Sequence, residues 1–440
     1  MIGSWIRRTV FWTLDAVKGG SVRKHYKDIV LKMSQNSDGP DAGQLSLLLE
    51  HAKRSTLFYR ELNEQKPLVQ LDDFPVVTKA DFLEQYEAFQ SDEYSGRPLH
   101  QMFTSGSTGV PFTANQDIEK RKRVLAEIIY FNETCGHKLG DRYVHFRLWT
   151  PGNQKTKWEQ FKQNLVPVHV IYLTDNELEK IRQLLRRDKS IHSVLTYAST
   201  IEYLTGYMKE CGDTPDMYNI KLVITGSETM DMHVKQRIKD TIGCRIIDRY
   251  SNQENGIIAQ TGDLSDDFTV NTACYYIELL KLDSDEEASE GELGRIIVTD
   301  LYNFVMPMIR YDTGDIAVKY GNEKGGTRRF KSMQGRKSDA FYDTKGDRMT
   351  PLAWGAFMER FDRFKQYQFI QEDAKKYVFK ANGAEGIYSK EEILEVMKNA
   401  LGDDAEIEVQ FVDTIPVLAS GKFKRTICNY HPKELDVQLH

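Results

Sequence analysis

Short apolar runs alternate with amphipathic stretches through the middle of the chain. Runs rich in β-branched and aromatic residues, which favour strands, cover residues 142–149, 166–173, 193–198, 221–228 and 244–251. Apolar residues at helical spacing separate most of these runs, at residues 175–188, 199–212 and 231–243. This strand–helix–strand alternation predicts an α/β domain with a mainly parallel sheet that is covered by helices. Ligands of such sheets bind beyond the carboxyl ends of the strands.

The hydrophobic pattern changes in character near residue 336. A hairpin-like alternation at residues 367–381 precedes a helical stretch at 389–401, and a further strand pattern follows at 406–412. Ser389 and Glu392 have the spacing of a capping box at the start of that helix. These elements predict a compact α+β unit of about 100 residues, which is a common size for a small domain.

The length of the chain supports a division into two domains, because 440 residues are too many for one hydrophobic core. We expect a large α/β domain at residues 1–335 and a small α+β domain at residues 336–440, with the boundary between residues 335 and 339. The acid-rich stretch at residues 281–292 lacks periodicity and reads as a solvated hairpin loop.

Composition excludes several classes of protein. A hydrophobic content of 40% with 28% charged residues is ordinary for a soluble globular protein. The net charge of −6 argues against a nucleic-acid partner, because phosphate backbones attract basic surfaces. No apolar run reaches membrane-spanning length, and the first residues lack the pattern of a cleavable signal. The five scattered cysteines have no zinc-like spacing and fit reduced thiols, so we expect a cytoplasmic protein.

The first 30 residues mix aromatic and basic side chains. The aromatic residues are Trp5, Phe11 and Trp12, and the basic residues include Arg7, Arg8, Lys18, Arg23 and Lys24. Such a segment could rest on an acidic membrane surface. A helix that is docked on the core, with its charges in solvent, is the favoured interpretation because the segment is short and polar overall.

The stretch "TSGSTG" at residues 104–109 is a candidate anion-binding loop. Its members are Thr104, Ser105, Gly106, Ser107, Thr108 and Gly109. Backbone N–H groups and hydroxyls of such a run can surround a phosphate. No basic residue follows until Lys120, and the Gly-Lys-Ser/Thr ending of a P-loop is missing. The loop is therefore not of the kinase type, and positive charge has to come from elsewhere.

Six short motifs occur in a fixed order along the chain. They are "FTSGSTGVP" (103–111), "TGSE" (225–228), "YSNQE" (250–254), "MPMIRYDTGD" (306–315), "QGRKSD" (334–339) and "ASGKFKR" (419–425). Each motif alone is a weak signal, since "RYDTGD", for example, also suits an ordinary turn. Together and in this order they resemble the adenylate-forming superfamily of acyl-CoA synthetases. The chain looks most similar to its phenylacetate–CoA ligase-like branch, which includes CapK-type proteins linked to polysaccharide biosynthesis.

This resemblance implies activation of a small carboxylic acid by ATP and Mg²⁺. The carboxylate attacks the α-phosphate, pyrophosphate leaves, and the acyl-adenylate then transfers its acyl group to coenzyme A. Thr104 to Gly109 would hold the leaving phosphates, and Glu254 would hold Mg²⁺ through its carboxylate. Lys422 would bridge the carboxylate and the α-phosphate. Lys422 and Mg²⁺ would thus supply the charge that the loop lacks.

The resemblance also implies a nucleotide site. Tyr250 would stack on adenine next to Ser251, and Gly226, Ser227 and Glu228 would line the adenine pocket. Asp315 would accept hydrogen bonds from the ribose hydroxyls, which suits a carboxylate because it only accepts such bonds. Arg336 would contact the nucleotide, and Asp339 would be the hinge about which the small domain turns.

The acid substrate is not determined by the sequence. Its pocket is expected between the sheet and the helix that follows the loop, around Tyr130, Phe131, Arg147, Trp149 and Tyr197. Arg147 either meets a second anionic group of the substrate or forms a salt bridge within the protein. The oligomeric state is also open between monomer and homodimer.

Two other functions remain open. The acyl group could pass to a carrier-protein thiol or to an amine instead of coenzyme A. The basic runs at residues 119–123 and 325–331 are candidate contacts for the phosphates of coenzyme A, or else ordinary solvated surface. A non-catalytic nucleotide-binding homologue is a second alternative, against which the presence of Glu254, Asp315 and Lys422 argues.

Overall fold

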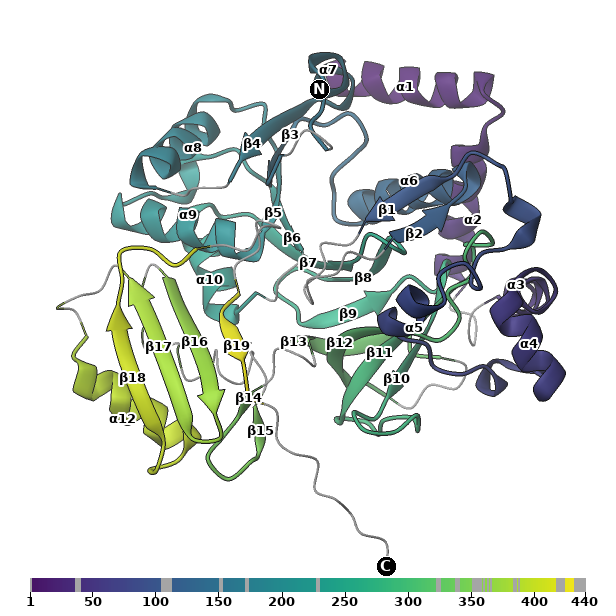
Figure 1. Cartoon of the computed structure of the whole chain (residues 1–440). Coiled ribbons are helices and arrows are strands. Elements are labelled where there is room, and N and C mark those ends of the chain that lie inside the picture. The colour runs from purple at the N-terminus through teal and green to yellow at the C-terminus, as the bar shows by residue number, and fades with distance from the viewer. Residues whose placement is uncertain are drawn as a thin grey trace, which may run out of the picture.

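A computed structural model shows the arrangement of the chain (Figure 1). It describes residues 2–35, 41–103, 113–149, 153–170, 174–226, 230–321, 326–336, 341–349, 366–382, 388–416 and 424–430, together with Met358, Phe361, Phe364 and Gly386. Within this part of the chain, no helix combines the length and the apolar character that a membrane span requires.

An 11-stranded sheet forms the centre of the molecule, in the order β10-β11-β12-β13-β9-β8-β7-β6-β5-β3-β4. Its parallel half consists of β3 (Tyr143–Arg147), β4 (Leu165–His169), β5 (Ser193–Tyr197), β6 (Leu222–Gly226) and β7 (Arg245–Ser251). Helices α8 (Asp175–Arg187), α9 (Ala198–Glu210) and α10 (Met232–Thr241) alternate with these strands. Every strand and helix expected between residues 142 and 251 is present, so the predicted α/β class is confirmed.

The other half of the sheet is antiparallel, so the sheet as a whole is mixed. It consists of β8 (Ile257–Thr261), β9 (Asp267–Val270), β10 (Tyr275–Leu280), β11 (Leu293–Asp300), β12 (Tyr311–Lys319) and β13 (Arg329–Arg336). A parallel pair of strands needs a long crossover connection, which is usually a helix. In the described part of the chain, the connections between these strands contain no helix, so the strands pair in the antiparallel direction. The expected hairpin loop at residues 281–292 joins β10 to β11.

Two groups of helices pack around this sheet. On the N-terminal side lie α1 (Ile2–Val17), α2 (Ser21–Ser34) and α6 (Ile118–Thr134), whose apolar residues share one core with the antiparallel strands. Helices α3 (Ala42–Ser55), α4 (Leu57–Gln65) and α5 (Lys79–Glu84) enclose a second core against the start of β12. The short helix α7 (Lys157–Gln163) precedes β4, and the strands β1 (His100–Phe103) and β2 (Thr113–Gln116) form a separate hairpin.

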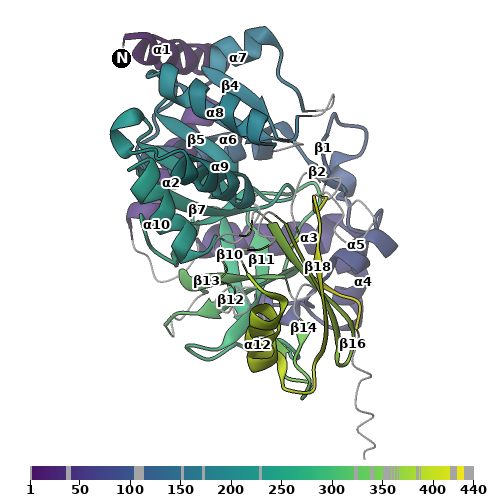
Figure 2. The same ribbon diagram turned by 90° about the vertical axis from the view of Figure 1, so that its left-hand side faces the viewer.

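The C-terminal region forms a second, smaller sheet in the order β18-β17-β16-β19 (Figure 1). It has its own apolar core, and Figure 2 shows the same region after a 90° turn. Its elements are β14 (Phe341–Tyr342), β15 (Arg348–Met349), β16 (Gln366–Asp373), β17 (Lys376–Asn382), α12 (Lys390–Leu401), β18 (Glu406–Phe411) and β19 (Thr426–Cys428). The expected hairpin and helix are confirmed, and Ser389 caps α12 by accepting a hydrogen bond from the Glu392 backbone N–H at 3.1 Å. The domain boundary between residues 335 and 339 stays a prediction.

Candidate active site

Four residues at or near the ends of neighbouring strands form one row across the parallel half of the sheet. Tyr197 of β5 lies beside Gly226 of β6, and Gly226 lies beside Arg249 of β7. Arg147 ends β3, two residues beyond the pair of His145 with Leu195. The face that carries this row is covered by α6, because Arg249 donates a hydrogen bond to Asn132 of that helix at 2.9 Å. The sheet thus gathers polar side chains at the edge where ligands of α/β proteins bind.

Gly226 leaves space above this row. A Cβ atom at Gly226 would approach only the Arg249 carbonyl oxygen, at 3.4 Å, which is ordinary van der Waals contact. The protein itself therefore does not require a glycine here. The absence of a side chain keeps the end of β6 accessible to a molecule that lies over the row, as the predicted adenine pocket requires.

Arg147 has an aromatic neighbour. Its guanidinium lies 5.8 Å from the centre of the Trp149 ring, a cation–π contact. No carboxylate in the described part of the chain forms an ion pair with Arg147, so the expected salt bridge is absent there. His145, on the same face of β3, is largely buried, and burial together with the charge of Arg147 lowers its pKa to about 3. The imidazole is therefore neutral beside the guanidinium at physiological pH.

A tyrosine–aspartate pair links the two halves of the sheet. The Tyr250 hydroxyl at the end of β7 donates a hydrogen bond to Oδ2 of Asp315 on β12, at 2.8 Å. Burial and the adjacent Asp315 carboxylate raise the pKa of Tyr250 well above its ordinary value. The phenol therefore stays protonated and acts as a fixed donor. Two residues that are 65 positions apart, both predicted for the nucleotide site, are brought into contact.

A second tyrosine holds the predicted metal ligand. Glu254 is buried, and its Oε1 accepts a hydrogen bond from the Tyr311 hydroxyl at 3.3 Å. Burial and Glu254 raise the pKa of Tyr311 well above its ordinary value. The Gln116 side-chain amide donates to the Glu254 carbonyl oxygen at 2.7 Å, which ties β2 to the same turn. Backbone and carboxylate of Glu254 are thus both fixed.

The donor set around Glu254 fits Mg²⁺. This ion prefers oxygen ligands and usually binds one or two carboxylates together with water and substrate phosphates. In the described ranges, no group of three or more His, Cys, Asp or Glu side chains could enclose a metal ion. A single carboxylate that shares the ion with a nucleotide is consistent with both observations.

A buried ion pair supports the turn that carries Glu254. Lys120 of α6 and Asp300 of β11 are fully buried, with Nζ 2.6 Å from Oδ2, and the Asn255 side-chain amide donates to the same Asp300 oxygen at 3.3 Å. Gly256 has φ 142°, and a Cβ atom there would lie 2.6 Å from the Glu127 carboxylate. Glycine is therefore required next to Asn255. Local sequence patterns do not reveal this support, because the residues come from three separate segments.

The same ion pair corrects one expectation. The basic run at residues 119–123 was a candidate contact for coenzyme A, but two of its cations are buried. Lys120 pairs with Asp300, and Arg123 donates to Asp28 of α2 at 2.5 Å. These two side chains hold α6 against the sheet and are not available to a ligand on the surface.

Arg425, the last residue of the "ASGKFKR" motif, contacts helices that pack beside the large sheet. Arg425, just before β19, forms ion pairs with Asp231, the residue before α10, at 2.9 Å and with Glu202 of α9. Its guanidinium also lies 5.6 Å from the centre of the Tyr367 ring on β16. These contacts hold the C-terminal sheet beside the parallel strands. Sequence analysis did not assign a role to Arg425, although it belongs to the "ASGKFKR" motif.

Several predicted residues lie outside the part of the chain that the structure describes. They are Thr104, Ser105, Gly106, Ser107, Thr108, Gly109, Ser227, Glu228, Asp339 and Lys422, and the side chain of Arg336. Their described neighbours indicate the positions of three segments. Phe103 of β1 pairs with Thr113 of β2 across the Gly/Ser/Thr loop, Gly226 ends β6, and the Arg336 backbone pairs with Asp315.

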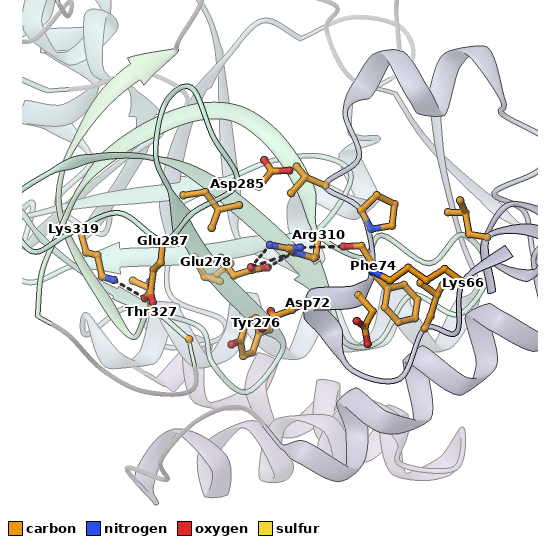
Figure 3. A pocket seen from close by; sticks show the side chains of 18 of the residues that line it. Lys66, Asp72, Phe74, Tyr276, Glu278, Asp285, Glu287, Arg310, Lys319 and Thr327 are labelled. Atoms are coloured by element: carbon orange, nitrogen blue, oxygen red, sulfur yellow. Dashed lines mark hydrogen bonds and ion pairs between the residues drawn. The ribbon is translucent and has the colours of Figure 1, made fainter. Parts of the chain in front are cut away.

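A cavity of about 920 Å³ lies elsewhere, between α4 and strands β10 and β12 (Figure 3). Ion pairs cross it, from Arg310 to Glu278 at 2.8 Å and from Lys319 to Glu287 at 2.5 Å. Its lining contains none of the predicted site residues. We do not take this cavity as the candidate site, because two of its cations, Arg310 and Lys319, are already paired with carboxylates.

Sequence comparison relates this chain to two kinds of protein. A family model described as the CapK C-terminal domain matches residues 341–429. A phenylacetate-coenzyme A ligase of Pseudomonas putida is 25% identical over 312 residues, which cover 66% of this chain and 68% of that protein. Protein CapK of Staphylococcus aureus is 21% identical over 435 residues, which cover 92% of this chain and 93% of that protein. The predicted resemblance is confirmed.

Solved structures give the fold. A 2-hydroxyisobutyryl-CoA ligase in the postadenylation state, in complex with R3-HIB-AMP, superposes with a TM-score of 0.70 at 17% identity, covering 90% of this chain and 93% of that chain. The chain has the fold of the adenylate-forming CoA ligases. The same ligase in the thioesterification state, in complex with 2-HIB-AMP and CoA, gives a TM-score of 0.55 at 19% identity, covering 88% of each chain.

Proposed function

We propose that this chain is an AMP-forming carboxylate ligase. It activates a small carboxylic acid with ATP, releases pyrophosphate, and transfers the acyl group to coenzyme A. The observation that carries this proposal is the contact of Tyr250 with Asp315, next to Glu254 and Tyr311, at the carboxyl ends of the parallel strands. A nucleotide needs a hydrogen-bond acceptor for its ribose and a hard oxygen ligand for its metal, and this edge supplies both.

In the first half-reaction a carboxylate oxygen of the acid attacks the α-phosphorus of ATP, and the bond to pyrophosphate breaks. No side chain forms a covalent bond, so the protein acts by positioning two anions and by neutralising their charge. Asp315, oriented by Tyr250, accepts the ribose hydroxyls. The acid lies over the row of Arg147, Tyr197 and Gly226, between the sheet and α6.

Mg²⁺, held by Glu254, supplies positive charge to the phosphates when it is bound. Tyr311 keeps the Glu254 carboxylate in one orientation. Lys422 neutralises the carboxylate and the α-phosphate from the small domain, and Arg425 holds its segment against α9 and α10. The Gly/Ser/Thr loop, which closes the hairpin of β1 and β2, receives the leaving phosphates.

A second acceptor is favoured by the extent of the CapK relationship. The relationship to CapK covers 92% of this chain, whereas the relationship to the phenylacetate-coenzyme A ligase covers 66%. The CapK model also matches residues 341–429, in the region that carries the small sheet. A carrier-protein thiol or an amine in place of coenzyme A is therefore the second candidate for the acyl acceptor.

Pyrophosphate release tests both candidates. The purified chain is incubated with ATP, Mg²⁺ and a panel of aryl, fatty, hydroxy and amino acids, with and without coenzyme A. Sustained release that needs coenzyme A establishes the first candidate and identifies the acid. Release that stalls after about one turnover with or without coenzyme A supports the second. If no acid gives release, the ligase proposal fails.

The lysine assignment has a matched control in the same segment. Lys422→Ala is expected to lower pyrophosphate release by about 100-fold or more, because one charged donor to the transition state is lost. ATP binding by the large domain is expected to persist, as measured by equilibrium titration. Lys424→Ala removes a similar charge two residues away and is expected to change release far less. Equal loss in both variants would contradict the role of Lys422.

A further inference from the structure

Helix α1 presents an apolar stripe to solvent. Ile6, Val10, Leu14 and Val17 follow one another at spacings of four, four and three residues, which places them on one side of the helix. Their exposed fractions lie between 48% and 79%. Such residues usually face the core of a soluble protein. An outward stripe of four therefore indicates a partner that covers it.

The apolar surface continues onto a second helix. Trp158 and Phe161 of α7 are 65% and 61% exposed, and their rings stack with centres 5.7 Å apart. Figures 1 and 2 show α1 and α7 together at one end of the molecule, away from the small C-terminal sheet. Arg7 joins the helices, because it donates to the Phe161 carbonyl oxygen at 3.1 Å. We call the two helices the α1–α7 surface.

The outward direction of the stripe is fixed by the other face of α1. Phe11 and Trp12 pack against the core that α2, α6 and the antiparallel strands share. Close packing of Gly140 beneath Ser4 and Arg7 holds the start of the helix, since a Cβ atom at Gly140 would lie 2.6 Å from the Ser4 carbonyl oxygen. The expected docking of this helix on the core is thus confirmed. The same docking leaves the second apolar face in solvent, which the sequence pattern did not reveal.

The charge around this surface has the sign opposite to that of the whole chain. Residues 2–18 contain three Lys or Arg and one Asp, and residues 155–163 contain three Lys and one Glu. The whole chain has a net charge of −6. A partner of this surface must therefore accept aromatic and aliphatic side chains and also be anionic. A second copy of the chain would bring two basic surfaces together, and like charges repel.

We propose that the α1–α7 surface binds the face of a lipid bilayer that contains anionic phospholipids. Helix α1 lies in the plane of the interface, with its stripe among the first methylene groups, and Trp158 and Phe161 insert beside it. Lys and Arg side chains at the rim contact the headgroup phosphates. The strand ends with the candidate active site remain in water, so the protein works on the membrane surface.

Vesicle flotation tests this proposal with the full chain. The probes are vesicles of phosphatidylcholine alone and vesicles of phosphatidylcholine mixed with phosphatidylglycerol. The chain is expected to float with the mixed vesicles, to bind the neutral ones much less, and to be released as ionic strength rises. The double variant Val10→Ser with Leu14→Ser is expected to lower the bound fraction about tenfold, since the buried apolar area falls. Lys18→Gln with Lys24→Gln is expected to weaken binding and its salt dependence.

Matched controls keep the test decisive. Leu47 and Val69 are also exposed, at 63% and 77%, but lie on other parts of the molecule. Leu47→Ser with Val69→Ser removes similar apolar area and is expected to float like the unaltered chain. Absence of flotation with anionic vesicles, or equal loss in both double variants, would overturn the proposal. A dimer of the unaltered chain that the Val10 and Leu14 double variant disrupts, as measured by sedimentation, would also overturn the proposal if neither protein binds vesicles.

Discussion

Tyr250 shows how a single residue can serve both stability and binding. Its ring packs edge-on against Phe330, with centres 6.3 Å apart, and its hydroxyl donates to Asp315. The sequence predicted both Tyr250 and Asp315 for the nucleotide site but not their contact. This hydrogen bond holds the Asp315 carboxylate in one orientation. Because the side chain is already ordered, it would lose little conformational entropy when it accepts two adjacent ribose hydroxyls.

Removal of the Tyr250 hydroxyl is therefore expected to affect nucleotide binding. Tyr250→Phe should raise the KM for ATP about tenfold, because a hydrogen bond to a charged group is lost at a buried site. Tyr218→Phe is the matched control, since Tyr218 donates to Asp213 near the opposite end of β6. Steady-state pyrophosphate release and thermal unfolding would be measured for both. The control should lose stability without a change in KM, and the assignment fails if both variants change KM equally.

At the scale of elements, β3 carries apolar side chains on one face and polar side chains on the other. Val144 and Phe146 belong to the core with α8 and α9, whereas His145 and Arg147 point to the face that α6 covers. The second face also contains His137, whose pKa is lowered to about 4 by burial. The lowered pKa values of His145 and His137 link the stability of this part of the sheet to pH.

His145 gives a pH prediction. In the unfolded chain this histidine takes up a proton near pH 6.5, but in the fold its pKa is about 3. Between these values the unfolded state binds more protons, so the free energy of unfolding falls as pH decreases. His145→Gln should remove up to about 1.4 kcal/mol per pH unit from that dependence. Urea unfolding between about pH 6.5 and about pH 4.5 checks this, with exposed His100→Gln as a control that should leave the slope unchanged.

At the scale of the whole molecule, polar contacts of Arg425 join the small sheet to the large one within the described part of the chain. Arg425 meets carboxylates from two helices of the large domain, Glu202 and Asp231. Hydrogen bonds from the Phe369 backbone and the Gln368 side chain hold the same segment to β16. An arrangement that depends on a few polar contacts can be exchanged for another at small cost.

Arg425→Ala should shift that arrangement. If the population of the observed arrangement falls about tenfold, the rate of pyrophosphate release falls about tenfold as well, while ATP affinity is kept. Lys375→Ala removes an ion pair with Asp404 that lies within the small sheet region and serves as the control. Pre-steady-state release and ATP titration would be measured for both variants. An unchanged rate in Arg425→Ala would show that these contacts do not matter for adenylation.

The sequence by itself determined the strands β3 to β7 with the helices α8 to α10, and in the small sheet region the strands β16, β17 and β18 with helix α12. Their periodicities of two and about 3.6 residues are local properties, so residues 142–251 and 367–412 could be interpreted without the fold. The motifs named the residues Gly226, Tyr250, Glu254 and Asp315 by resemblance. The strand end at Ser251 also followed from local pattern.

Only the tertiary structure decided which side chains meet. The bonds of Tyr250 to Asp315 and of Tyr311 to Glu254 join residues 65 and 57 positions apart, and no local pattern records such a pairing. Burial is likewise a property of the whole fold. The sequence suggested that Lys120 and Arg123 belong to a surface patch, but in the fold both are buried and form ion pairs. Val10 and Leu14, in contrast, are exposed to solvent. Periodicity shows that a helix has an apolar face, but the neighbours that the chain folds against determine whether that face is covered.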